Sequence, residues 1–204
     1  TLLSAGEPHP VTTVRADGSS PIVLTCDHAA NRIPKSLGAL GLPKSERERH
    51  IAWDIGAAGV AMHLSELLDA PLVIQNYSRL VIDCNRPLES EQLIPSRSEA
   101  TDIPGNQSIP ISERQQRVDE IFSPYQRAIT TLLDKREQHD RQTVFVPVHS
   151  FTPSYLGETR KEHLGILYGN VQSLAQRLLE ELEQETELVV GDNEVQGALE
   201  PSRC

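Results

Sequence analysis

Polar residues that can bind a metal ion follow two apolar runs of the sequence, at the point where each run ends. Asp27 and His28 come directly after the run 21–26, and His149 follows the run 143–148. Two imidazoles and a carboxylate suit zinc, which in catalytic sites keeps one position open for water. Because zinc activates such a water, these residues predict hydrolytic chemistry. The simpler alternative is that each histidine only caps its strand or faces solvent.

Two arginines close to an asparagine indicate what the substrate carries. Arg79 and Arg86 lie on either side of Asn85 in the sequence. Guanidinium groups bind carboxylates through paired hydrogen bonds, so this trio predicts an anionic substrate. The alternative is a surface salt-bridge cluster that the arginines form with Asp83 and Glu89.

The hydrophobic pattern predicts strands alternating with helices. Short apolar runs are typical of buried strands, and apolar residues at steps of three to five are typical of amphipathic helices. The predicted strands are 21–26, 71–75, 80–83, 143–148, 163–168 and 187–190; the predicted helices are 45–69, 112–136 with a kink at Pro124, and 171–185. Residues 1–20 are expected to be irregular, and the proline-rich residues 87–111 to form a long loop, which is usually functional or mobile.

This alternation predicts an α/β fold with a mostly parallel sheet and helices on both faces. Binding sites in such sheets lie at the carboxyl ends of the strands. If the strands are parallel neighbours, the polar residues that follow them converge at one edge.

The length, charge and composition of the chain exclude several classes of function. A chain of 204 residues fits one domain. Its formal net charge of −10 makes nucleic-acid binding unfavourable. The three cysteines form no Cys-x-x-Cys motif, no run is long enough to span a bilayer, and the first residues lack a signal-peptide pattern. We therefore expect a cytoplasmic protein with no membrane partner.

Several segments together resemble the N-formylglutamate amidohydrolase family. They are Cys26-Asp27-His28-Ala-Ala-Asn31-Arg-Ile-Pro34, His50-Ile-Ala-Trp-Asp54-Ile-Gly56, Ser78-Arg79-Leu-Val-Ile-Asp83-Cys-Asn85-Arg86-Pro87, Ile103-Pro-Gly-Asn106, Val148-His149-Ser150-Phe-Thr-Pro153 and Gly191-Asp192-Asn193-Glu194. Each motif alone is weak, but they occur in order and at suitable spacing from about residue 20 to residue 194.

The resemblance implies a fold similar to zinc carboxypeptidases and aspartoacylases (phosphorylase/hydrolase-like), with a mixed sheet and helices on both faces. Those relatives bind zinc through a His-x-x-Glu pair and a distant histidine, which would correspond to His28 and His149. The chain has Asn31 where the relatives have the ligand glutamate. Asp54 is our substitute for the missing carboxylate, and Asp27 is the runner-up.

The resemblance also assigns the substrate contacts. Asn85 and Arg86 match an Asn-Arg pair that holds the substrate carboxylate in the relatives, and Arg79 matches an upstream arginine. Asn106 and Ser150, in two further matching segments, are assigned to substrate binding as well.

Members of the family continue beyond the equivalent of residue 194, where the relatives place a general-base glutamate on a late strand. We therefore expect residues 1–204 to form a single hydrolase domain that lacks its C-terminal part. Glu194 is the candidate in this chain for polarising water.

These inferences predict a zinc-dependent hydrolase that cleaves the amide bond of a small anionic N-acyl amino acid, N-formyl-L-glutamate above all. One alternative is hydrolysis of another N-acyl amino acid or of a peptidoglycan amide. Another is a non-catalytic relative that binds carboxylates without turnover. A nucleophilic mechanism through Cys26 or Ser150 is disfavoured because neither residue lies in a Gly-x-Ser-x-Gly elbow.

Overall fold

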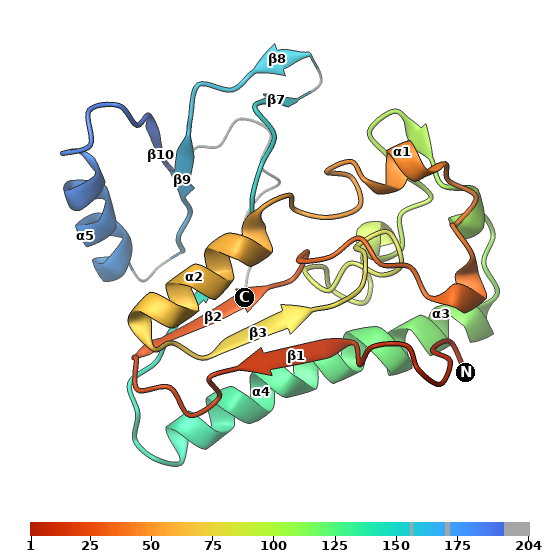
Figure 1. Ribbon diagram of the computed structural model, residues 1–204, viewed down its shortest axis with the longest axis horizontal. Helices are drawn as coiled ribbons and strands as arrows, with labels where there is room; N and C mark the ends of the chain where they lie inside the picture. Colours follow the sequence, from red (N-terminus) through yellow and green to blue (C-terminus); the bar gives the residue numbers. More distant parts are fainter. Residues whose placement is uncertain (156, 170–171, 194–204) are drawn as a thin grey trace. The chain divides into compact units, whose positions relative to one another are not determined.

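The computed structural model describes residues 1–155, 157–169 and 172–193 (Figure 1). The chain divides into two compact units, Thr1–Phe151 and Thr152–Cys204. All candidate site residues that the structure describes lie in the first unit. The single hydrolase domain stays a prediction. Among the described residues, no helix has the length and apolar character needed to cross a bilayer.

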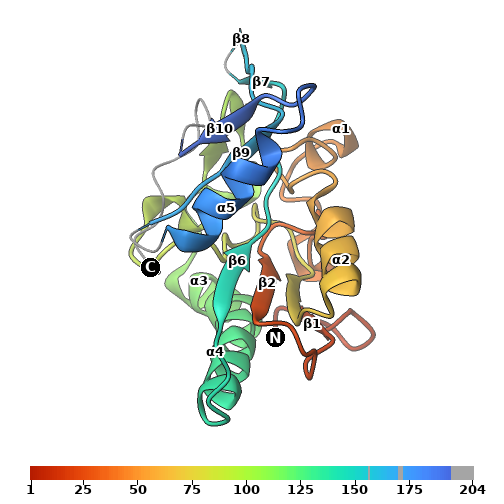
Figure 2. The same cartoon turned by 90° about the vertical axis from the view of Figure 1, so that its left-hand side faces the viewer.

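The first unit contains a mixed, mostly parallel sheet, as predicted. Its strands are β1 (Val11–Val14), β2 (Ile22–Cys26), β3 (Leu72–Gln75) and β6 (Val144–Pro147), in the order β1-β3-β2-β6. β2 runs parallel to both β3 and β6, whereas β1 pairs antiparallel with β3. The carboxyl ends of β2 and β6 therefore lie side by side, which brings the residues after these strands together (Figure 2).

Helices α2 (Ala57–Leu68) and α4 (Ser123–Glu137) cover opposite faces of this sheet (Figure 2). Successive side chains of a strand point to opposite faces. Val23 accordingly packs in one apolar cluster with Tyr125 of α4, and Leu24 packs in the other with Ala61 of α2. Both faces of β2 are thus buried, which explains its unbroken apolar sequence.

The predicted helix 45–69 is wrong in its first half. The chain forms only the short helix α1 (Lys44–Arg47) and then a run of turns before α2. Gly56, with φ of 86°, adopts the left-handed conformation at the start of α2, which glycine tolerates and which a continuous helix excludes. This break is what leaves Asp54 on a turn rather than on a helix.

Two further predictions about the first unit are wrong. Residues 1–20 contain β1, an edge strand whose β-branched sequence is short and half exposed, so its pattern is weak. Residues 80–83 are not a strand but a buried turn, in which the Val81 amide donates to the Ser78 carbonyl and the Asp83 amide donates to the Leu93 carbonyl. Apolar side chains are needed for burial in either conformation, so the pattern could not distinguish them.

The predicted helix 112–136 is confirmed, but its hydrogen-bond pattern changes along its length. It consists of α3 (Ile111–Arg117), a π-helical turn (Val118–Phe122) and α4. Pro124 lies in the first turn of α4, where its missing amide proton disturbs the regular hydrogen-bond ladder and favours the irregular turn before it.

The predicted loop 87–111 contains only short elements: two 3₁₀ turns (Glu91–Leu93 and Pro104–Asn106) and the hairpin of β4 (Arg97–Ser98) and β5 (Thr101–Asp102). A third 3₁₀ turn, Lys35–Leu37, precedes α1. Arg117, whose side chain is fully buried, ties the loop to the fold. It donates to the Val81 carbonyl (2.9 Å), to Asn106 Oδ1 (2.7 Å) and to Glu113 Oε1 (2.6 Å).

Replacing Arg117 by leucine is expected to destabilise the first unit. The acceptors of Val81 and Asn106 would stay buried without a donor, and each such loss costs about 1–3 kcal/mol. Urea denaturation should show a free energy of unfolding lower by at least about 2 kcal/mol. Gln116→Leu, at an exposed position of the same helix, is the matched control. Equal stability of the two variants would show that the buried arginine does not hold the loop.

The second unit is small. In it β7 (Ser154–Tyr155) pairs antiparallel with β8 (Glu158–Thr159), β9 (Leu164–Ile166) pairs parallel with β10 (Val190–Asp192), and α5 spans Ser173–Leu182. The predicted strand 163–168 and helix 171–185 are confirmed with shorter bounds, as far as the described residues reach. The predicted strand 187–190 begins only at Val190, so its position was wrong.

Candidate active site

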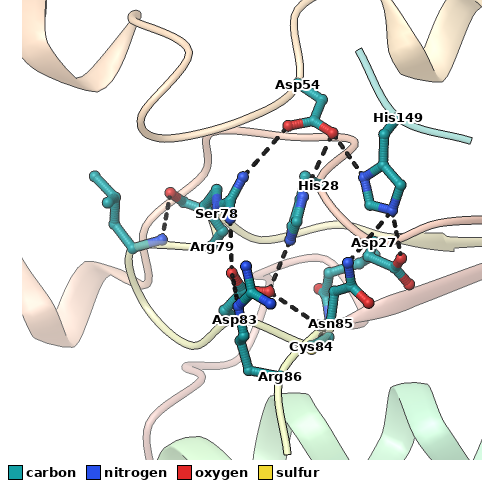
Figure 3. Close-up of polar contacts among 12 residues, drawn as sticks. Asp27, His28, Asp54, Ser78, Arg79, Asp83, Cys84, Asn85, Arg86 and His149 are labelled. Atoms are coloured by element: carbon teal, nitrogen blue, oxygen red, sulfur yellow. Dashed lines mark hydrogen bonds and ion pairs between the residues drawn. The ribbon is translucent and has the colours of Figure 1, made fainter. Parts of the chain in front are cut away.

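Three side chains of the predicted metal site lie together in the first unit (Figure 3). His28 follows β2 and His149 follows β6, at the adjacent carboxyl ends of these parallel strands. Asp54 lies on the turn before α2, and its backbone amide donates to the His28 carbonyl (2.9 Å). Each of the three residues offers a ligand atom within 4.8 Å of those of the other two.

One oxygen of Asp54 faces both imidazole rings. Asp54 Oδ2 lies 2.8 Å from His149 Nδ1 and 3.4 Å from His28 Nδ1. The centroids of the two rings are 5.1 Å apart. Asp54 Oδ2 therefore lies close to one nitrogen of each ring.

The outer nitrogen of each ring faces a second carboxylate. Asp83 Oδ1 lies 2.7 Å from His28 Nε2, and Asp27 Oδ2 lies 3.3 Å from His149 Nε2. A carboxylate only accepts hydrogen bonds, so each Nε2 is placed to donate to its outer carboxylate. With the proton on Nε2, each Nδ1 offers its lone pair to a metal in place of the proton that otherwise faces Asp54. Metal-binding histidines in proteins are commonly oriented by an outer carboxylate in this way.

These contacts shift the pKa values of the side chains in the cluster. Burial opposes protonation of His149, but hydrogen bonds with Asp27 and Asp54 outweigh it and raise the pKa of His149 to about 9. Burial likewise opposes ionisation of Asp54, but the two histidines outweigh it and hold the pKa of this carboxyl well below its usual range. These contacts favour the protonated form of both histidines, and a cation would compete with the protons for the same position.

The residues present fit a zinc ion. His28 Nδ1 is buried and makes no hydrogen bond with any residue that the structure describes, although it faces Asp54. A cation between this nitrogen and Asp54 Oδ2 would satisfy both atoms. Two imidazole nitrogens and one carboxylate oxygen form a ligand set typical of catalytic zinc, with a fourth position left for water.

The predicted substrate-binding trio lies beside this cluster (Figure 3). Arg79 Nη2 donates to Asp83 Oδ2 (2.9 Å), and Arg79 Nη1 lies 3.5 Å from Asp54 Oδ1. Arg86 Nε lies 4.0 Å from Asp83 Oδ2, and the Asn85 backbone amide donates to Asp83 Oδ1 (2.9 Å). Both arginines thus pair with Asp83, as the alternative expected, but Asp83 is buried, so these ion pairs do not lie at the surface.

Both arginine side chains keep partial contact with solvent. The side chain of Arg79 is 25% exposed and that of Arg86 is 16% exposed. Asn85 Nδ2 is 3.5 Å from His149 Nε2, which places its amide against the metal-site histidine. Guanidinium groups that are held on one side by Asp83 and reach solvent on the other suit recognition of a dissolved carboxylate.

The two other residues that were predicted to bind substrate, Ser150 and Asn106, lie in different places. The Ser150 amide lies 3.4 Å from Asp54 Oδ2, so this residue belongs to the cluster. Asn106 is buried apart from it, and its side chain binds the Leu80 and Pro95 carbonyls and Arg117. These contacts hold the loop; a contact of Asn106 with substrate stays a prediction.

Other assignments that the sequence left open can be placed as well. The side-chain amide of Asn31 donates to the Arg47 carbonyl (3.0 Å). Cys26 is fully buried, and this burial raises the pKa of its thiol to about 12, which does not suit a nucleophile. Glu194 lies outside the described residues.

Two residues of the site were not assigned roles from the sequence. Asp83 binds His28 on one side and Arg79 on the other, and its place two residues before Asn85 in a matching motif was the available signal. The Tyr125 hydroxyl donates to Asp27 Oδ1. Nothing in the pattern of its helix distinguishes this tyrosine from an ordinary core residue.

The fold and site define an α/β protein with a candidate metal position next to two arginines, at the carboxyl ends of parallel strands. Residues 20–196 match the family model described as N-formylglutamate amidohydrolase. The chain therefore belongs to the N-formylglutamate amidohydrolase family, a family of enzymes that hydrolyse amide bonds.

Two solved structures are similar to this chain. The crystal structure of gene product Atu2144 from Agrobacterium tumefaciens is 38% identical, with a TM-score of 0.91 over 95% of this chain and 77% of that one. The N-formylglutamate amidohydrolase from Ralstonia eutropha JMP134 is 18% identical, with a TM-score of 0.69 over 91% of this chain and 76% of that one, which shows a shared fold. No curated protein matches the chain.

Proposed function

We propose that this chain hydrolyses the amide bond of N-formyl-L-glutamate with a zinc ion held by His28, Asp54 and His149. The observation that carries the proposal is the convergence of two imidazole Nδ1 atoms on Asp54 Oδ2, with one of these nitrogens buried and making no hydrogen bond to any described residue. Membership of the N-formylglutamate amidohydrolase family supports the reaction.

The metal position would be built by one oxygen and two nitrogens. A bound zinc ion would polarise the scissile carbonyl and lower the pKa of a coordinated water to about 7. His28 and His149 contribute their Nδ1 lone pairs. Asp83 holds the proton of His28 on Nε2, which fixes the ring so that Nδ1 faces the metal position.

Arg79, Asn85 and Arg86 would bind the carboxylates of the substrate. Asp83 contacts both arginines and His28, so the guanidinium groups have a fixed position relative to the metal ligands. Binding energy from the carboxylates would thereby orient the formyl amide toward the metal position. Ser150, whose amide lies near Asp54, would add a contact at the same place.

The proposal also covers the type of fold, the class of substrate and the location in the cell. The mixed sheet with one antiparallel edge strand supports a fold like that of the zinc carboxypeptidases. The substrate would be a small anionic N-acyl amino acid, for which two arginines supply the positive charge. A cytoplasmic location is proposed from the sequence.

Formate release is the direct test of the reaction. The zinc-loaded protein should release formate and glutamate from N-formyl-L-glutamate, and should act more slowly on N-formyl amino acids that lack the second carboxylate. A preference for N-acetylated amino acids or for a peptidoglycan amide would contradict the proposed substrate. Binding of N-formyl-L-glutamate without any turnover would identify a non-catalytic carboxylate-binding relative.

A further inference from the structure

His149 is the most exposed of the three residues around the metal position. Its side chain is 33% exposed, compared with 3% for His28 and 6% for Asp54. It follows β6, which is an edge strand of the four-stranded sheet. Packing restricts such a side chain less than a buried one, so a contact in addition to that with Asp54 would help to hold the His149 ring for a metal.

Asp27 provides such a contact at the Nε2 atom of the ring. Its Oδ2 lies 3.3 Å from His149 Nε2, and the whole residue is buried. Asp27 follows β2 directly, so its backbone is fixed by pairing with the strands on both sides. The carboxylate can still rotate about its side-chain bonds unless its other oxygen is also held.

Tyr125 holds that other oxygen. Its hydroxyl donates a hydrogen bond to Asp27 Oδ1, and the residue is fully buried in α4. Burial, together with the negative charge of Asp27, raises the pKa of Tyr125 well above its usual value, so the phenol remains a hydrogen-bond donor. The three residues thus form a chain of contacts from a helix in the core to an imidazole at the surface.

We propose that Tyr125 and Asp27 are positioning residues for His149. Tyr125 fixes the orientation of the Asp27 carboxylate, and Asp27 keeps the proton of His149 on Nε2, so that Nδ1 faces Asp54. This inference rests on the proposed zinc site. The simpler possibility is that Tyr125 only satisfies a buried carboxylate, in which case it contributes to stability and not to metal binding.

Zinc affinity separates the two possibilities. The zinc dissociation constant of the full chain would be measured by competition with a chromophoric chelator for the parent protein, Tyr125→Phe, Asp27→Ala and the double variant. Loss of an outer contact to a metal-binding histidine typically weakens metal affinity about 10- to 100-fold. We expect weakening of this size in each single variant. Because Tyr125 acts through Asp27, the double variant should bind zinc no more weakly than Asp27→Ala.

Tyr77→Phe is the matched control. Tyr77 is also fully buried, and its hydroxyl donates to the Pro8 carbonyl (2.9 Å), away from the histidines. Tyr77→Phe should lower the thermal stability of the metal-free protein with no change in zinc affinity. If Asp27→Ala does not fold, Asp27→Asn takes its place, since it keeps the volume of the side chain.

A second readout is the absorption spectrum of the cobalt-substituted protein. Its visible bands should shift in Tyr125→Phe, because the position of His149 changes, and should stay unchanged in Tyr77→Phe. Parental zinc affinity in Tyr125→Phe would overturn the inference, as would an equal further loss when Tyr125→Phe is added to Asp27→Ala. Failure of the parent protein itself to bind zinc would instead refute the proposed metal site, and the inference with it.

Discussion

Replacing His28 or His149 by alanine is expected to remove zinc from the protein and to abolish formate release. Elemental analysis should find about one zinc per chain in the parent protein and almost none in either variant, because catalytic zinc sites need three protein ligands. The metal supplies several kcal/mol of transition-state stabilisation. Turnover of N-formyl-L-glutamate should therefore fall on the order of 10³-fold.

His63→Ala is the matched control for this experiment. His63 lies on an exposed position of α2, and its removal should leave the zinc content unchanged. His28 is buried between two carboxylates, so its variant is also expected to lose stability, whereas the more exposed His149 allows the same test with a smaller effect on folding. Retention of stoichiometric zinc in both variants would rule out the proposed ligands.

Replacing Arg86 by alanine is expected to raise the KM for N-formyl-L-glutamate about 10- to 100-fold with a small change in kcat. A hydrogen bond to a charged group contributes about 1.5–3 kcal/mol, and this residue contacts Asp83 at 4.0 Å with its side chain still partly open to solvent. An interaction that is equally strong in the bound substrate and in the transition state affects KM and not kcat, so its loss raises KM. Steady-state kinetics of formate release measure both parameters.

Arg97→Ala serves as the control for charge alone. Arg97 lies on the exposed β4–β5 hairpin, where it pairs with Asp102 at 3.7 Å, and its removal changes the net charge equally. It should leave KM within about twofold of the parental value, since exposed ion pairs contribute little. A fall in kcat at unchanged KM in Arg86→Ala would show that this arginine acts on the reaction rather than on substrate binding.

Much of the candidate site could be predicted because its residues follow strands. A strand buried on both faces needs an unbroken apolar run, so β2 is visible in the sequence together with the polar residues that follow it. The edge strand β6 is also an apolar run followed by a polar residue, although its side chains are mostly exposed. Parallel pairing then places His28 and His149 at the same edge. Asp54 could be selected only through its matching motif, since it lies in the half of the predicted helix 45–69 that does not form.

The errors share a physical cause. The run 80–83 is apolar because it is buried, and burial alone does not distinguish a strand from a turn that is held by side chains. The break before α2 depends on the left-handed conformation of Gly56, and β1 depends on pairing with β3, far along the chain. None of these outcomes can be read from the hydrophobic pattern of a short segment.

The sequence by itself therefore determined the α/β class, the principal strands and the types of ligand available to a metal. Only the tertiary structure decided which nitrogen of each histidine faces Asp54, and that Asp83 and Asp27 hold the other nitrogens. It also decided that Asn106 is bound within the loop and that Tyr125 reaches Asp27 from α4. Hydrogen-bond direction depends on the positions of atoms in residues far apart in the sequence, such as Tyr125 and Asp27, which are separated by 98 residues, and no periodicity in the sequence encodes such positions.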